Sequence, residues 1–333
     1  MKKYVAVLFV MAVLGSGIVN AAFMEFVAVG DAGNAADTRP VRGEYYFGDV
    51  SYEYQIGKYE TTNAQYATFL NTVAASDPHG LYNTNMANSS YSSRGGIIRS
   101  GTSGSYTYSA VAGRENMPVN WVSWRSAARV ANWMHNGMQS DAATTEYGAY
   151  TNVDSEPITH NADAKFWIPT ADEWYKAAYY KGGSTNAGYW TYPTQKDWTP
   201  VGGLDPTAYP ASNRINYQAN NYDFGQGYDQ GDFVTVGYYS STANAYGTFD
   251  QGGNVFEWNE EIPPAYYGTT YRWRNGGNFL QNSAGEVSYD SLSVAVAANG
   301  QNVTGFRLAT VIPEPATICL MSIGCVTLLR RRK

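Results

Sequence analysis

The sequence YGTFDQGGNVFEW, residues 246–258, combines a glycine pair with two flanking carboxylates. Glycine tolerates positive φ, so Gly252 and Gly253 followed by an asparagine permit a tight backbone course. Asp250 and Glu257 stand on either side, and the spacing 250, 253, 255 and 257 can place two carboxylates and two carbonyls around one hard cation. The alternative interpretation is a solvated turn in which Glu257 forms a structural salt bridge.

Three segments upstream of this stretch have the pattern of helices. The first and the third begin with capping boxes, in which a threonine is followed three residues later by Gln or Glu: Thr62 with Gln65, and Thr170 with Glu173. The second begins at Ser123. Apolar residues recur at helical spacing behind each cap, which predicts one buried face per helix.

Predicted strands are short and separated by glycine-rich and asparagine-rich turns. They fall at 26–29, 52–56, 166–168, 234–236 and 306–308. Residues 83–117 are rich in Asn, Ser, Gly and Tyr, and we expect a long surface excursion with short hairpins there. The predicted fold class is therefore α+β, with three main helices, short strands and much irregular structure.

Composition limits the class of protein. The chain has 333 residues and a formal net charge of −6, with 15% charged and 15% aromatic residues. The acidic balance, without Lys/Arg clusters in the body, argues against nucleic-acid binding. The apolar content is enough for a sizeable core, which excludes global disorder. No linker-like break interrupts the body, so residues 22–312 are predicted to form one domain.

Residues 1–21 have the pattern of a secretory signal peptide. Lys2 and Lys3 precede an apolar run over 4–14, and Val19-Asn20-Ala21 supplies small residues for cleavage. The alternative is a buried strand or helix. We expect signal peptidase to act on this segment, so that the protein is exported.

Residues 313–333 have a three-part pattern. Pro313-Glu314-Pro315 is followed by an uncharged stretch over 316–329 and by the basic residues 330–333. Fourteen residues are short of the about 20 that a full span needs. The pattern resembles the PEP-CTERM signal of exosortase-processed bacterial proteins. That resemblance implies an inner-membrane anchor through a short transmembrane stretch, then cleavage by exosortase and transfer to the cell surface or extracellular matrix.

Six blocks of the body together resemble the formylglycine-generating enzyme (sulfatase-modifying factor) family, whose fold is C-type-lectin-like. The blocks stand in the family's order and span most of the body: IGKYETTN at 56–63, PVNWVSW at 118–124, WIPTADEW at 167–174, 246–258, RNGGNF at 274–279 and GFR at 305–307.

The resemblance implies calcium as a structural cofactor. The family's ligand positions map onto Asp250, Gly253, Val255 and Glu257. A second calcium site would use Asn216 and Tyr217, with Asp229 as the third ligand and Asp232 as its competitor for that role.

The family's oxidation chemistry does not carry over to this chain. It needs two cysteines after the second glycine pair, Gly276-Gly277, because thiolates are the soft ligands that copper(I) prefers. Gln281 and Glu286 stand at those positions, and the only cysteines, Cys319 and Cys325, lie in the C-terminal segment. Copper and formylglycine-generating activity are therefore not expected, and no catalytic residue is assigned.

In this family the ligand face is built from late loops, including the region of Gly276 and Gly277. The candidate ligand-binding residues combine amides, a carboxylate and aromatic rings: Asn278, Gln281 and Glu286 in that region, with Trp273 and Tyr289 nearby. Such a set suits a sugar or a peptide, and the alternative is that the residues serve packing. We expect a secreted, non-oxidising binder of an extracellular polysaccharide or peptide. The alternatives are an enzyme of altered chemistry that uses Glu286 or an unrecognised metal, and a purely structural matrix component.

Overall fold

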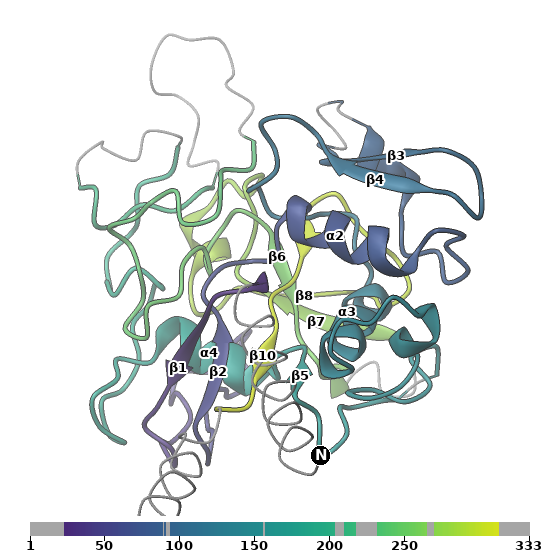
Figure 1. Cartoon of the computed structure of the whole chain (residues 1–333). Coiled ribbons are helices and arrows are strands. Elements are labelled where there is room, and N and C mark those ends of the chain that lie inside the picture. Colours follow the sequence, from purple (N-terminus) through teal and green to yellow (C-terminus); the bar gives the residue numbers. More distant parts are fainter. Residues whose placement is uncertain are drawn as a thin grey trace, which may run out of the picture.

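The computed structural model describes residues 23–312, except 89, 91–93, 156, 204–209, 218–231 and 265–269. The predicted signal peptide at 1–21 and the sorting segment at 313–333 lie outside the described residues. The fold is the predicted α+β arrangement, in which helices and short strands alternate with long irregular connections (Figure 1).

The described helices α2, α3 and α4 begin where the caps predict. In α2 (Asn63–Val73), Thr62 accepts from the Gln65 backbone amide and the Gln65 side chain accepts from the Thr62 amide. The same box opens α4 (Ala171–Tyr179), with Thr170 and Glu173. Helix α3 (Trp124–His135) is capped by Ser123. Reciprocal capping satisfies amides that have no partner within the helix, which explains why local sequence fixed these starts.

The first sheet joins the two ends of the body. Its strand order is β1 (Phe26–Val29), β2 (Tyr54–Gly57), β10 (Ala309–Thr310) and β5 (Phe166–Trp167), with antiparallel pairing throughout. Strand β10 lies between β2 and β5, so the last described strand completes the centre of this sheet (Figure 1).

The second sheet carries the glycine-rich stretch. Its order is β8 (Leu292–Val296), β7 (Tyr271–Asn275), β6 (Phe256–Trp258) and β9 (Thr304–Gly305), and β6 pairs with β9 in parallel. Between the two sheets, residues 306–308 cross from β9 to β10. The predicted strand at 306–308 is therefore wrong, because the chain leaves one sheet there before it joins the other.

The predicted strand at 234–236 is also wrong. Its backbone amides bond singly to separate partners, Val234 to the Asn254 side chain and Val236 to the Asn116 carbonyl, so no ladder forms. By contrast, the excursion at 83–117 does contain the expected hairpin, β3 (Ile97–Ser100) with β4 (Thr107–Ala110). It also contains the short 3₁₀ helix η1 (Thr84–Ala87).

Buried aromatic residues form the core. Helices α2 and α3 bury one cluster that includes Phe69 and Trp133, and β4 packs on α2. Helix α4 buries a second cluster with Trp174 and Trp273 against β7. Within the described part of the chain, the helices are all too short or too polar to span a bilayer.

Candidate functional site

A buried ion pair lies at the centre of the glycine-rich stretch. Arg307, from the crossing between the sheets, and Glu257, in β6, are both inaccessible to solvent. Arg307 Nε lies 2.5 Å from Glu257 Oε2, and Nη2 lies 2.7 Å from Oε1. Trp174 Nε1 donates to Oε2 as well, at 2.7 Å. Both carboxylate oxygens thus accept from protein donors, as in the salt-bridge interpretation of Glu257.

Two further carboxylates surround this pair. Asp250 adopts φ +60° and its Oδ2 accepts from the Gly237 amide at 2.5 Å. Glu60 is 1% exposed, and its Oε1 accepts from Asn254 Nδ2 at 3.1 Å, whereas Oε2 has no hydrogen-bond partner among the described residues. Burial, with the neighbouring charges of Asp250 and Glu257, raises the pKa of Glu60 well above its usual value. Burial also raises the pKa of Asp250 to about 6.

Glu60 was not among the site residues predicted from the sequence. Its signal was available, since Glu60 precedes the Thr62 cap within the block IGKYETTN, but nothing local indicates that it meets a stretch almost two hundred residues later. The three carboxylates lie within electrostatic range of the single guanidinium of Arg307, so the group would carry excess negative charge if all three were ionised. A low-dielectric interior penalises such an excess unless protons or a cation compensate it.

These residues fit a hard cation only with main-chain help. Among the described side chains, no three of His, Cys, Asp or Glu converge on one metal position. Glu257 already neutralises Arg307, so the donors left in the predicted set are Asp250 and the carbonyls of Gly253 and Val255. The unpartnered oxygen of Glu60 is of the type that Ca²⁺ prefers.

The glycine pair is required by close packing. Gly253 has φ +78°, and a Cβ there would lie 2.2 Å from the Asn216 carbonyl oxygen. Asn254 N donates to that same carbonyl at 2.9 Å. The segment of the predicted second calcium site is therefore packed against the first. Asp229 lies outside the described residues.

Two residues of the predicted second site are held by protein partners. Asn216 Nδ2 donates to Asn254 Oδ1 at 3.1 Å, and the Tyr217 hydroxyl donates to the Pro200 carbonyl at 2.8 Å. The competing Asp232 pairs with two arginines. Arg94 Nη1 lies 3.1 Å from its Oδ1, and Arg114 Nη1 lies 2.9 Å from its Oδ2.

The predicted ligand face divides into buried and accessible residues. Trp273 is 6% exposed and packs edge-on against Tyr45 and Phe47, and Asn278 is 4% exposed and accepts from the Leu280 amide. The other three residues, Gln281, Glu286 and Tyr289, are partly exposed.

Glycine also shapes the turn that precedes these accessible residues. Gly277 has φ +73°, and a Cβ there would lie 2.2 Å from the Glu286 carbonyl oxygen. The close approach brings this turn against the 3₁₀ helix η4 (Ala284–Val287). The two positions at which the family's cysteines are expected thus lie in neighbouring segments, Gln281 in the turn region and Glu286 in η4.

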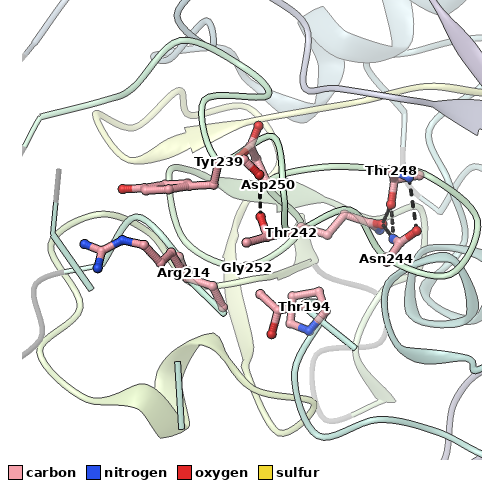
Figure 2. A pocket seen from close by; sticks show the side chains of 11 residues that line it. Thr194, Arg214, Tyr239, Thr242, Asn244, Thr248, Asp250 and Gly252 are labelled. Carbon is pink, nitrogen blue, oxygen red and sulfur yellow. Dashed lines mark hydrogen bonds between the residues drawn. The ribbon is translucent and has the colours of Figure 1, made fainter. Parts of the chain in front are cut away.

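A small polar cavity borders the glycine-rich stretch (Figure 2). Thr194, Arg214, Tyr239 and Asp250 are among its lining residues, and its volume is about 10 Å³. That is room for about one water molecule. Asn244 and Thr248, hydrogen-bonded to each other, close one side. The cavity is a packing feature rather than a ligand site.

Two larger hollows open elsewhere. One, of about 490 Å³, is lined by residues of 23–25 and 57–65 and includes Glu60. The other, of about 520 Å³, lies between residues 35–39 and 180–197. Tyr289 adjoins the second hollow, because its amide donates to the Thr191 carbonyl at 2.9 Å. The groove cannot be recognised from the sequence, since its two walls are far apart along the chain.

Comparison with known proteins agrees with the architecture. A crystal structure of CarF is 20% identical over 87% of this chain and 99% of its own, with a TM-score of 0.53. The Treponema denticola variable protein 1 is 18% identical over 86% of this chain and 95% of its own, with a TM-score of 0.52. At these identities the likeness concerns the fold alone. No curated protein matches the chain.

Residues 35–312 match the profile of the sulfatase-modifying factor enzyme 1-like domain. That range covers both sheets except β1, all three helices, the glycine-rich stretch and the loops that carry Gln281 and Glu286. The chain therefore belongs to the FGE-sulfatase family, whose domain is described as sulfatase-modifying factor enzyme 1-like.

Proposed function

We propose that this protein is a non-oxidising member of the FGE-sulfatase family that binds an extracellular ligand through its late loops. The observation that carries the proposal is the pair Gln281 and Glu286 at the positions of the family's cysteines. An amide and a carboxylate cannot form the copper–thiolate bonds that the family's reaction needs. The same groups are good hydrogen-bonding partners for a polar ligand.

Accessibility supports binding at this face. Gln281, Glu286 and Tyr289 are partly exposed on a scaffold whose glycine turns and buried aromatics hold the loops in place. Tyrosine at such a position offers a large contact area with a polar end. Trp273 and Asn278 belong to the supporting layer, so they are not part of the proposed contact surface.

We also propose that the protein is exported and sorted by its two ends. The proposal rests on the sequence of residues 1–21 and 313–333, which have the patterns of a signal peptide and of a PEP-CTERM signal. Signal peptidase and exosortase would be the processing partners. The ligand would then be met at the cell surface or in the matrix, as a polysaccharide or a peptide.

Calcium is the proposed structural cofactor. Asp250, the carbonyls of Gly253 and Val255, and Glu60 would hold it, and the excess of buried carboxylates favours a divalent cation there. The ion would stabilise the glycine-rich stretch, residues 246–258, which precedes the late loops in the chain. It takes no part in a reaction.

The binding proposal is tested with the full-length chain in detergent against an oligosaccharide array and a peptide panel. The double variant Gln281→Ala/Glu286→Ala is expected to lose the signal of the best ligand. Tyr147→Ala is the matched control, because Tyr147 is 53% exposed and follows α3 rather than the late loops. Silence of folded wild-type protein across both libraries would contradict a binding role.

A further inference from the structure

The groove between residues 35–39 and 180–197 has the size and lining of a ligand site. Its volume of about 520 Å³ falls within the about 300–1,000 Å³ usual for small-molecule sites. It adjoins the proposed binding face, because the Arg39 guanidinium lies 4.0 Å from the centre of the Tyr289 ring. The inference below rests on the proposed binding function and names the class of ligand.

The charged groups on one wall are compensated by each other. Arg39 Nη2 lies 2.7 Å from Asp37 Oδ2, and its Nε lies 3.1 Å from both carboxylate oxygens. The Tyr175 hydroxyl donates to Asp37 at 2.8 Å. Arg39 Nη1 donates to Thr191 Oγ1 at 3.2 Å, and Nη2 also donates to the Trp190 carbonyl at 3.0 Å. Arg39 therefore links the two walls of the groove by hydrogen bonds. Its guanidinium N–H groups are directed at protein acceptors and not at an anionic ligand.

An aromatic side chain fixes the inner part of the groove. The Tyr189 hydroxyl donates to the Ala35 carbonyl at 2.8 Å and accepts from Asn34 Nδ2 at 2.8 Å. The Tyr189 ring contacts Tyr180 edge-on, with 4.9 Å between centroids. With its hydroxyl hydrogen-bonded and its ring packed against Tyr180 and Tyr175, the partly exposed ring is a pre-positioned apolar surface.

Small polar groups stand at the rim. Thr185, Asn186 and Asp197 are all exposed and line the groove. Asp197 is fixed in place, since its Oδ1 accepts from Thr191 N at 2.9 Å and from Thr191 Oγ1 at 3.0 Å. A fixed carboxylate, an amide and a hydroxyl around an aromatic ring offer both acceptors and donors to a polyhydroxylated molecule.

We propose that this groove binds a neutral oligosaccharide. A sugar ring presents C–H groups to the Tyr189 face and hydroxyls to Asn186 and Asp197. An acidic sugar would meet the charge of Asp197 and the net charge of −6 of the chain, while Arg39 is already paired. The groove thus selects against uronic-acid polymers.

The test titrates the full-length chain in detergent with cellotetraose, maltotetraose and tetragalacturonate, using calorimetry and saturation-transfer NMR. We expect one neutral tetrasaccharide to bind and tetragalacturonate to bind weakly or not at all. Asn186→Ala and Asp197→Asn change exposed side chains, and the asparagine keeps an acceptor for Thr191. Each is expected to weaken binding about tenfold, as for the loss of one hydrogen bond to a charged or well-placed group. Tyr147→Ala should bind like wild type.

Three results would overturn the inference: no neutral tetrasaccharide binding up to about 10 mM, binding that both groove variants leave unchanged, or preference for tetragalacturonate. The proposed function fails separately. If a peptide binds through Gln281 and Glu286 while the tetrasaccharides do not, only the groove inference is wrong. If folded protein binds no sugar and no peptide, both are wrong.

Discussion

The Arg307 side chain contacts segments that lie far apart in the sequence. Besides its pair with Glu257, its Nη1 donates to the Gly57 carbonyl and its Nη2 to the Phe249 carbonyl, each at 2.8 Å. The side chain thus ties the end of β2, the glycine-rich stretch and β6 together at the point where the chain crosses between sheets.

Replacing Arg307 by methionine should lower the free energy of unfolding by about 3–5 kcal/mol, because Glu257 would stay buried without its cation. Urea denaturation measures the change. Lys58→Met is the control, since the Lys58–Glu25 pair is largely exposed on its acidic side and is expected to contribute about 1 kcal/mol or less. Equal losses in the two variants would contradict the central role of Arg307.

His160 gives stability a pH dependence. Its Nδ1 lies 2.9 Å from each oxygen of Glu260, and its ring stacks on Trp167. Burial lowers the pKa of His160, but the hydrogen bond and charge of Glu260 outweigh burial, so the pKa is raised. The folded state therefore binds the proton more tightly than the unfolded chain does. The stabilisation is complete below about pH 6.5, the unfolded pKa, and is lost as pH rises through the folded pKa.

We expect His160→Gln to remove this component. The difference in unfolding free energy between wild type and variant should be largest below about pH 6.5 and shrink at higher pH. Urea denaturation at a series of pH values below and above about 6.5 measures this difference in unfolding free energy. A difference that stays constant or grows with pH would show that the pair does not titrate as described.

The proposed calcium site near Glu257 can be tested by removing the metal ion. An ion bound only by the native state stabilises it by mass action, about 2.7 kcal/mol at a hundredfold excess over Kd. EDTA should therefore lower the melting temperature of wild type, and Asp250→Asn should remove most of that effect. A melting temperature that EDTA leaves unchanged would refute the assignment.

At the scale of elements, local chemistry predicted the helices better than the strands. Capping boxes at Thr62 and Thr170 are complete within four residues, so they can be read from the sequence and were confirmed. Strands β5, β9 and β10 have two residues each, too short for any periodicity. Their positions depend on partners that only the folded chain brings together.

The cap of α4 offers a stability test. Thr170→Ala should lower the free energy of unfolding by about 1 kcal/mol, because the Glu173 amide loses its acceptor. Thr68→Ala is the matched control, since Thr68 is exposed within α2 and alanine favours a helix interior. Thermal denaturation of both variants decides the point. Equal changes would mean that the capping contact contributes nothing.

At the scale of the whole molecule, the sequence predicted the family and fold class through the order of its six blocks. It did not predict which of the candidate binding residues reach the surface. Trp273 was a candidate for binding, yet it packs against Tyr45 and Phe47, more than two hundred residues earlier in the chain. The groove beside Tyr289 was missed for the same reason, because its walls come from distant segments.

The two four-stranded sheets bring sequence blocks that are far apart in the chain into contact. Strand β10 joins the first sheet and β9 the second, so the block GFR at 305–307 holds both sheets to the glycine-rich stretch. The scaffold can be kept in this way while the residues at the positions of the family's cysteines change. The proposed non-oxidising function relies on this, because it keeps the fold with Gln281 and Glu286 at those positions.

The most direct test of the non-oxidising assignment is an aldehyde assay. The full-length chain, supplied with copper(I) and oxygen, is incubated with a cysteine-bearing peptide. Any aldehyde formed on the peptide is captured with a hydrazide and quantified by mass spectrometry. A Cys319→Ser/Cys325→Ser variant controls for the two C-terminal thiols. We predict no aldehyde above the protein-free blank in either sample; aldehyde formed on the peptide by both proteins would contradict the account.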